Sequence, residues 1–162
     1  MQSHNISICY QETNDSKELE EKYRILLSRA WEAFRNAYAP YSQFKVGAAL
    51  QLQNGTIVIG NNQENSAYPS GLCAERVAIF AASAQYPNIP IEAIAIVANT
   101  SLIQSENPIT PCGACRQVLT EYEHLAKKPI TVILQGDSEK IWIIEGVKNL
   151  LPFMFHGEQL KK

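Results

Sequence analysis

Three of the four cysteines fall into two short motifs that must meet in the folded chain if they hold a metal ion. Cys112 and Cys115 form a Cys-x-x-Cys pair, and Cys73 stands well before them in Cys-Ala-Glu-Arg. Residues three apart on a helix share one face, with β-carbons about 5–6 Å apart. Two thiolates on tetrahedral zinc lie about 3.8 Å apart, given bonds of about 2.3 Å. The pair therefore fits one metal ion if a helix begins near Cys112.

A Cys-x-x-Cys pair alone does not decide between zinc binding, redox chemistry and a role in packing. Cys73 favours zinc, because it also stands at a predicted helix start, where the helix dipole stabilises a thiolate. A catalytic zinc has three protein ligands and an open position, whereas a structural zinc has four. His124 lies about 13 Å beyond Cys115 along the predicted helix and cannot reach a metal ion bound by the cysteines. His156 stays open as a fourth ligand, and Cys9 is expected to be a packed or surface thiol.

Glu75 follows Cys73 by two positions. Acidic residues favour first helical turns because of the dipole, so a purely structural role is open. Beside an open zinc position, Glu75 would take a proton from water and return it to a substrate nitrogen. Positions i and i+2 lie about 200° apart on a helical wheel. We therefore expect Cys73 at the helix cap, outside the regular turns, if both side chains face one metal.

Length and charge restrict the partners of the chain. Its 162 residues, 46% hydrophobic, fit one domain over 1–162, with residues 1–15 as an N-terminal extension. The net charge of −2 lacks the basic excess that nucleic-acid binding needs. No apolar run approaches the ~20 residues of a membrane helix, and residues 1–10 lack signal-peptide features. We expect a cytoplasmic protein with a small-molecule substrate and no nucleic-acid or membrane partner.

Hydrophobic periodicity and turn signals indicate an α/β domain with helices covering a mixed sheet. The Asn54-Gly55 pair is a strong hairpin signal between the first two strands. The expected elements are a helix over 15–38, strands over 44–53 and 56–60, a helix over 73–85, a strand over 91–98, a helix over 112–127, and strands over 130–134 and 141–144.

The two cysteine motifs, Cys-Ala-Glu-Arg at 73–76 and Pro-Cys-Gly-Ala-Cys-Arg-Gln at 111–117, closely resemble those of the small, three-cysteine cytidine deaminases. Residues 41–50 resemble the first strand of that family and residues 60–65 its nucleoside-binding loop. Leu-Leu-Pro at 150–152, with Phe155, is similar to its C-terminal motif. The resemblance runs from about residue 22 to residue 157. It implies a three-layer α-β-α sandwich with a mixed, roughly five-stranded sheet.

The resemblance also implies the chemistry. One Zn²⁺ per chain would be held by Cys73, Cys112 and Cys115 and would activate a water that attacks C4 of the cytosine ring. Glu75 would move the protons in a hydrolytic deamination. The products would be uridine or deoxyuridine and ammonia, formed from cytidine and 2'-deoxycytidine in pyrimidine salvage.

Five further residues receive roles from this resemblance. Asn62 and Glu64 would hydrogen-bond the ribose hydroxyls. Phe44 would pack against the nucleoside, and Phe155 would reach in from a neighbouring subunit of a homotetramer with shared active sites. For both aromatic residues an ordinary core position stays open. Arg76 would donate to the thiolate sulfurs, because three thiolates leave a zinc centre with net charge −1; a surface salt bridge is its alternative role.

Three other functions stay open on the sequence. One is deamination of another aminated pyrimidine or related heterocycle, such as a nucleoside antibiotic, and a second is editing of a polynucleotide. The third is a non-catalytic, zinc-stabilised interaction module closed by His156, which would leave Glu75 unexplained. The chain also departs from the family in an N-terminal segment, in the residues 66–71 and in a longer loop over 99–111. These departures bear mainly on substrate preference.

Overall fold

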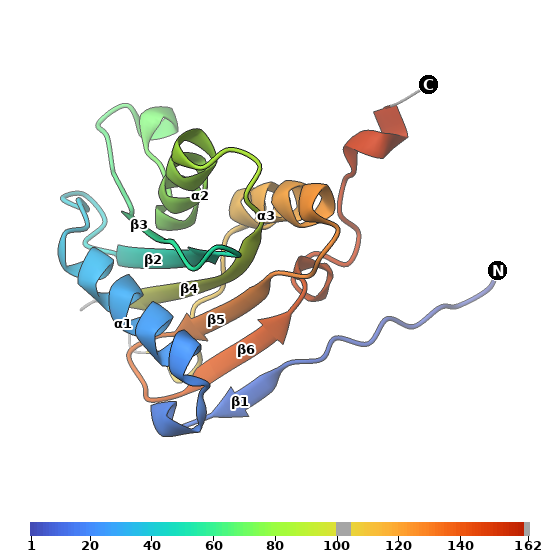
Figure 1. Cartoon of the computed structure of the whole chain (residues 1–162), viewed down its shortest axis with the longest axis horizontal. Coiled ribbons are helices and arrows are strands. Elements are labelled where there is room, and N and C mark those ends of the chain that lie inside the picture. Colours follow the sequence, from blue (N-terminus) through green and yellow to red (C-terminus); the bar gives the residue numbers. More distant parts are fainter. Residues whose placement is uncertain (100–104, 161–162) are drawn as a thin grey trace.

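The computed structural model describes residues 1–99 and 105–160 and shows one mixed sheet with helices on both faces (Figure 1). The strand order is β1-β6-β5-β4-β2-β3, and all neighbours are antiparallel except β4 and β5. The elements are β1 (Gln11–Thr13), α1 (Glu21–Arg35), β2 (Lys45–Leu52), β3 (Ile57–Asn61), α2 (Ala74–Gln85), β4 (Ile91–Asn99), α3 (Gly113–Ala126), β5 (Thr131–Gln135) and β6 (Ile141–Glu145).

The predicted three layers are confirmed by how the central strand divides its side chains. Ala95 and Val97 of β4 belong to a core cluster with α1, and Ile94 and Ile96 belong to a second cluster with α2 and α3. Successive side chains of a strand point to opposite faces, so a strand covered on both sides is apolar throughout. This explains why residues 93–98 of β4 are all apolar and buried.

The sheet has six strands rather than the roughly five expected. The additional strand is β1, which pairs antiparallel with β6 in the register Gln11 to Ile143. Next to it, the ring of Tyr10 packs against Trp142 at 4.8 Å between centroids, and Trp142 Nε1 donates to Glu12 Oε2 at 2.7 Å. Three polar residues carry almost no strand signal, so the pairing depends on contacts that only the fold supplies.

The first helix is shorter at both ends than predicted. Asp15 does act as a cap, since its Oδ1 accepts a hydrogen bond from the Lys17 amide at 2.8 Å, but it caps a separate 3₁₀ turn, Ser16–Glu18. Leu19 then adopts an extended conformation (ψ 148°), and α1 begins at Glu21. The capping signal was therefore assigned to the wrong helical element.

Two glycines bring helices unusually close to the sheet. A β-carbon at Gly47 of β2 would lie 2.2 Å from the Ala30 carbonyl oxygen of α1. A β-carbon at Gly60 of β3 would lie 2.5 Å from the Ala78 amide nitrogen of α2. Any larger residue would push the helix away. Gly60 thus allows α2 to pack close to the sheet. The first turn of this helix carries Glu75.

The other strand and helix predictions agree with the structure to within a few residues. The hairpin of β2 and β3 is confirmed, with Gly55 at φ +83° in its turn. The long loop expected over 99–111 lies partly outside the described residues. Within the described part of the chain, none of the helices has the length and hydropathy that crossing a membrane requires.

Candidate metal centre and substrate cavity

Two helix starts bring the three cysteines together. Cys73 is the N-cap of α2 and Cys112 is the N-cap of α3, and both have extended backbone angles (ψ 151° and 164°). Cys115 lies one turn into α3 and is fully buried. The predicted position of Cys73, just outside the regular turns, is confirmed. Neither thiol makes a capping hydrogen bond to the start of its helix, so both can face a common centre.

The geometry of the thiols fits a metal ion. All three Sγ atoms lie within 4.8 Å of one another, and those of Cys112 and Cys115 are 3.6 Å apart. Tetrahedral zinc with thiolate bonds of about 2.3 Å requires sulfurs about 3.8 Å apart. The Cys73, Cys112 and Cys115 cluster is therefore able to bind zinc with little movement.

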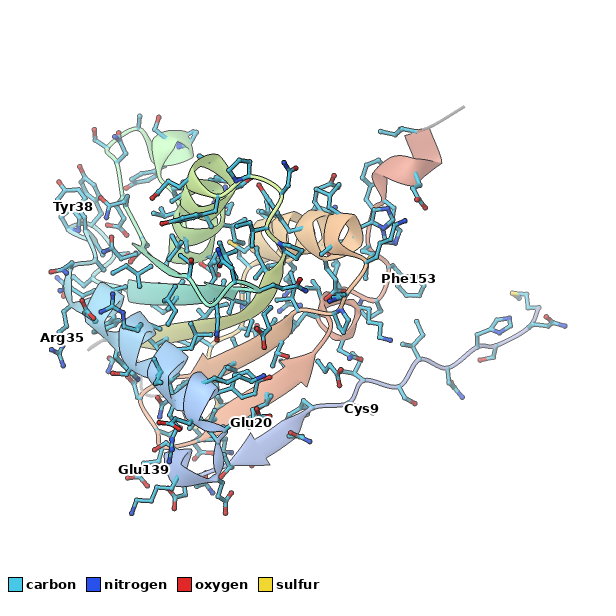
Figure 2. All side chains as sticks on the ribbon, in the orientation of Figure 1. Cys9, Glu20, Arg35, Tyr38, Glu139 and Phe153 are labelled. Atoms are coloured by element: carbon cyan, nitrogen blue, oxygen red, sulfur yellow. The ribbon has the colours of Figure 1, made fainter. Side chains whose placement is uncertain are left out.

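No fourth protein ligand joins this cluster among residues 1–99 and 105–160. His156 instead faces His124, with ring centroids 5.5 Å apart, and His124 Nε2 lies 3.3 Å from a Glu158 oxygen. Cys9 is exposed just before β1 (Figure 2) and is not part of the cluster. Three protein ligands are the number found in catalytic zinc sites, which keep one position for water or substrate.

The charge state of the thiols depends on shared protons and on an arginine. Hydrogen bonds from the Cys115 thiol and from Arg76, whose Nη2 lies 3.3 Å from Cys73 Sγ, lower the pKa of Cys73 to about 5. The same contact raises the pKa of Cys115, because its proton is the one it shares with the Cys73 sulfur. A metal ion that binds here displaces that proton and takes over its electrostatic role.

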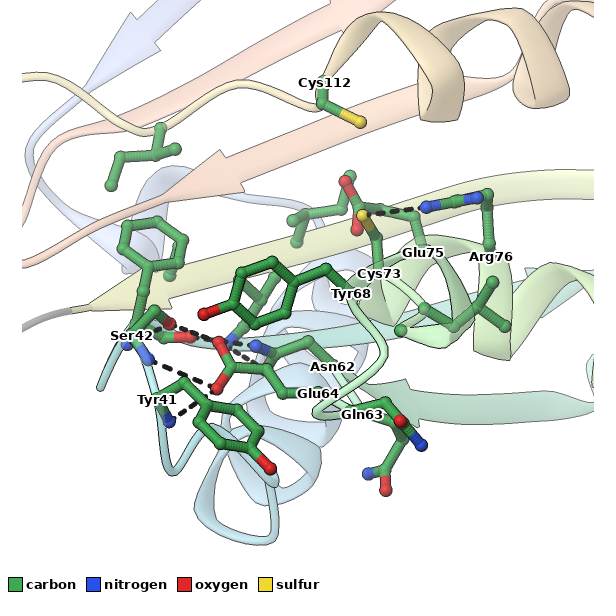
Figure 3. A pocket seen from close by; sticks show the side chains of 18 of the residues that line it. Tyr41, Ser42, Asn62, Gln63, Glu64, Tyr68, Cys73, Glu75, Arg76 and Cys112 are labelled. Carbon is green, nitrogen blue, oxygen red and sulfur yellow. Dashed lines mark hydrogen bonds between the residues drawn. The ribbon is translucent and has the colours of Figure 1, made fainter.

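Glu75 is buried next to the thiols, with 4% of its surface exposed. Burial raises the pKa of its carboxyl group, because the charged form loses its hydration. Figure 3 shows its carboxyl group beside the Cys73 sulfur at one end of the cavity. A carboxyl group with a raised pKa at such a position is suited to accepting a proton and giving it back.

The cavity that opens beside the thiols has a volume of about 680 Å³, within the usual range for small-molecule sites. Phe44, Asn62 and Glu64, which the resemblance singled out, all line it together with Glu75. Phe155 does not line it in this chain. That side chain is 53% exposed on the C-terminal segment, where Gln117 Nε2 donates to the Phe155 carbonyl at 2.9 Å.

Asn62 and Glu64 both bind the segment 41–46, which also lines the cavity (Figure 3). Asn62 Oδ1 accepts from the Val46 amide at 2.8 Å, and its Nδ2 donates to the Phe44 carbonyl at 2.8 Å. Glu64 accepts from the Ser42 hydroxyl and from the Tyr41 amide, the latter at 2.8 Å. These bonds lower the pKa of Glu64 and keep it ionised.

Sequence reasoning missed two residues of the cavity wall. Ser42 binds Glu64 directly, and Tyr68 stands over the opening with its ring 6.2 Å from that of Tyr41. Ser42 had a local signal, since a serine two residues before Phe44 can hold the Phe44 amide through its hydroxyl. Tyr68 lies in the segment 66–71 that departs from the family pattern, but its own place on the cavity wall depends on the turn Tyr68–Ser70.

Comparison with known sequences agrees with this site. Residues 20–131 match the family described as the cytidine and deoxycytidylate deaminase zinc-binding region. Cytidine deaminase of Halalkalibacterium halodurans is 40% identical over 137 residues, covering 85% of this chain and 96% of the relative. Cytidine deaminase of Sporosarcina psychrophila is 42% identical over 135 residues, covering 83% of this chain and 92% of the relative.

Solved structures agree as well. The crystal structure of cytidine deaminase from Burkholderia pseudomallei is 40% identical and superposes with a TM-score of 0.71, covering 82% of this chain and 98% of that chain. That of cytidine deaminase from Mycobacterium tuberculosis is 29% identical with a TM-score of 0.64, covering 85% and 99%. The chain therefore belongs to the zinc-binding cytidine and deoxycytidylate deaminase family.

Proposed function

We propose that the chain hydrolyses the amino group of cytidine to give uridine and ammonia, with Glu75 as the proton carrier. One observation carries this proposal: a buried carboxyl group with a raised pKa lies beside three converging thiols at the end of a cavity of nucleoside size. A structural metal site has no use for this carboxyl group. A zinc-stabilised interaction module closed by His156 is disfavoured, because His156 lies against His124 instead.

The roles of the residues follow from their positions. Cys73, Cys112 and Cys115 would hold the zinc ion, which when bound supplies a Lewis acid that lowers the pKa of water. Glu75 would take a proton from the attacking water and deliver protons to the ring nitrogen and the departing amine.

Replacing Glu75 by Gln tests this function. The variant should retain about one zinc ion per chain and lose deamination by at least about a hundredfold, because general acid–base catalysis contributes that much or more. Glu121→Gln on the exposed face of α3 is the matched control and should behave as wild type. Ultraviolet absorbance of cytidine and ammonia release measure turnover. A Glu75→Gln enzyme at the wild-type rate would refute the proposal.

The substrate proposal includes 2'-deoxycytidine as well as cytidine, with Glu64 and Asn62 as contacts to the sugar. These two contacts are supported by the position of both residues on the cavity wall, where the ionised Glu64 can accept a hydrogen bond from a hydroxyl group. A panel of cytidine, 2'-deoxycytidine, other aminated pyrimidine nucleosides and a single-stranded oligonucleotide tests this. If another heterocycle or the oligonucleotide is turned over faster than cytidine, that compound is the preferred substrate and the proposal of cytidine is wrong.

The proposal also includes a homotetramer in which Phe155 enters the cavity of a neighbouring subunit. Its support is the exposure of apolar side chains on the C-terminal segment, Phe153 at 88% and Phe155 at 53%. Mixed assembly gives a sharp test. Glu75→Gln and Phe155→Ala chains, each weak alone, should regain activity when unfolded and refolded together, because some cavities then contain Glu75 and Phe155 from different chains. No recovery would mean that Phe155 acts elsewhere.

A cytoplasmic location completes the proposal. Its support is that all four cysteines are free thiols, as is usual in a reducing compartment.

A further inference from the structure

We infer that Ser42 is a positioning residue for nucleoside binding, which holds Glu64 and the backbone of Phe44 in a fixed relation on the wall of the cavity. Its hydroxyl donates to Glu64 Oε1 and accepts from the Phe44 amide at 3.0 Å. The Ser42 hydroxyl oxygen thus connects the Glu64 carboxylate, which is proposed to bind the sugar, to the backbone of Phe44, whose ring is proposed to pack against the nucleoside. The inference rests on the proposed function of the site.

Backbone amides hold one oxygen of the Glu64 carboxylate, and the Ser42 hydroxyl holds the other. Oε2 accepts from the Tyr41 amide at 2.8 Å and from the Ser42 amide at 3.3 Å, so this oxygen is fully engaged. A carboxylate oxygen has about two acceptor positions. Oε1 uses one for the Ser42 hydroxyl and keeps one for a ligand. The hydroxyl therefore determines the direction in which the free position of Oε1 points.

The backbone next to Ser42 shows why this bond is needed. Gln43 has φ +55°, a conformation that costs free energy for a residue with a β-carbon, and its amide donates to the Ala39 carbonyl at 3.1 Å. The turn is thus strained between Ser42 and Phe44. Asn62 fixes the far side of Phe44 through the Phe44 carbonyl and the Val46 amide. The Ser42 hydroxyl fixes the near side.

Ser42→Ala should raise KM for cytidine about tenfold, the loss expected for a hydrogen bond to a charged group, with kcat changed much less. Ser42→Thr, which keeps a hydroxyl group, should restore KM to near the wild-type value. Ser138→Ala is the matched control, because the Ser138 hydroxyl also bonds to a loop, at the Glu106 carbonyl, away from the cavity. If Ser42→Ala does not fold, Ser42→Cys keeps the volume with a weak donor and should show the same rise in KM.

Two further measurements identify Glu64 as the residue through which Ser42 acts. In a Glu64→Ala background, Ser42→Ala should have little further effect on KM, because residues that act as a unit are not additive. With 2',3'-dideoxycytidine, which lacks the 2' and 3' hydroxyls that Glu64 is proposed to bind, the KM penalty of Ser42→Ala should largely disappear. Equal penalties for both substrates, or additive effects of the two variants, would overturn the inference. Wild-type enzyme without activity on cytidine would instead refute the proposed function.

Discussion

The Arg76 guanidinium donates to the Cys73 sulfur across 3.3 Å, from the first turn of the helix that Cys73 caps. Its Nε is buried with no hydrogen-bond partner in the described residues, so the side chain is held in place by the sulfur and by packing. The negative charge on Cys73 raises the pKa of Arg76 further. Arg76 is therefore placed to withdraw charge from an electron-rich thiolate cluster.

Arg76→Gln should retain zinc and lower turnover by about ten- to a hundredfold, the range found when groups that orient metal ligands are removed. Three thiolates without the guanidinium leave excess negative charge, which opposes ionisation of a water molecule. The measurement is kcat for cytidine beside zinc content. Arg29→Gln, on the exposed face of α1 where Arg29 pairs with Glu32, should leave both unchanged. Unchanged turnover in Arg76→Gln would show that this hydrogen bond is dispensable.

The metal ligands could be predicted from the sequence because two local rules place them. Helix starts and a three-residue spacing decide where Cys73, Cys112 and Cys115 point, and both rules act over a few residues. The apolar run of β4 similarly predicts burial on both faces. In each case the signal lies within one element, although the meeting of Cys73 with the other two cysteines also depends on how α2 and α3 pack.

The parts that could not be predicted depend on contacts between distant segments. β1 is a strand only because β6 offers a free edge with which it can pair. The two strands are far apart along the chain: Glu12 and Trp142, which share a hydrogen bond, are separated by 130 residues. Ser42 is important because Glu64, on another segment, lies within reach of its hydroxyl. The role of Phe155 depends on a neighbouring subunit and stays a prediction.

Removing the metal should change the number of reactive thiols. With zinc bound, only the exposed Cys9 should react quickly with a thiol reagent, because the other three sulfurs are ligands. After chelation, Cys112 should react next, since it is exposed, while Cys115 is buried and should react last. The Cys9→Ser variant removes the first phase and serves as the control. Equal thiol counts with and without chelator would contradict metal binding by these cysteines.

Gly60→Ala should lower the free energy of unfolding by about 1–3 kcal/mol, the usual cost of overpacking. The new β-carbon would lie 2.5 Å from the Ala78 amide nitrogen, which cannot move without shifting α2. Gly113→Ala is the matched control, because a β-carbon there has no other atom within 4 Å. Urea unfolding measures both variants. Equal stabilities would show that α2 can shift away from the sheet at little cost.

Glu123 on α3 connects three parts of the fold through one carboxylate oxygen. Its Oε2 accepts from the Ile130 amide and from the Val147 amide, both at 2.8 Å, and so ties α3 to the start of β5 and to the turn after β6. Glu123→Ala leaves both amides without their partner. Because hydrogen bonds to charged groups contribute about 1.5–3 kcal/mol, we expect the variant to lose stability in that range.

Glu121→Ala provides the control for Glu123→Ala, since it removes an exposed carboxylate from the same helix. It should change the free energy of unfolding by less than about 0.5 kcal/mol, as is usual for surface substitutions. Chemical denaturation of both variants gives the comparison. Ile130 and Val147 are fully buried, so water cannot easily replace the carboxylate at their amides. Similar stabilities for the two variants would mean that these amides find another acceptor when Glu123 is removed.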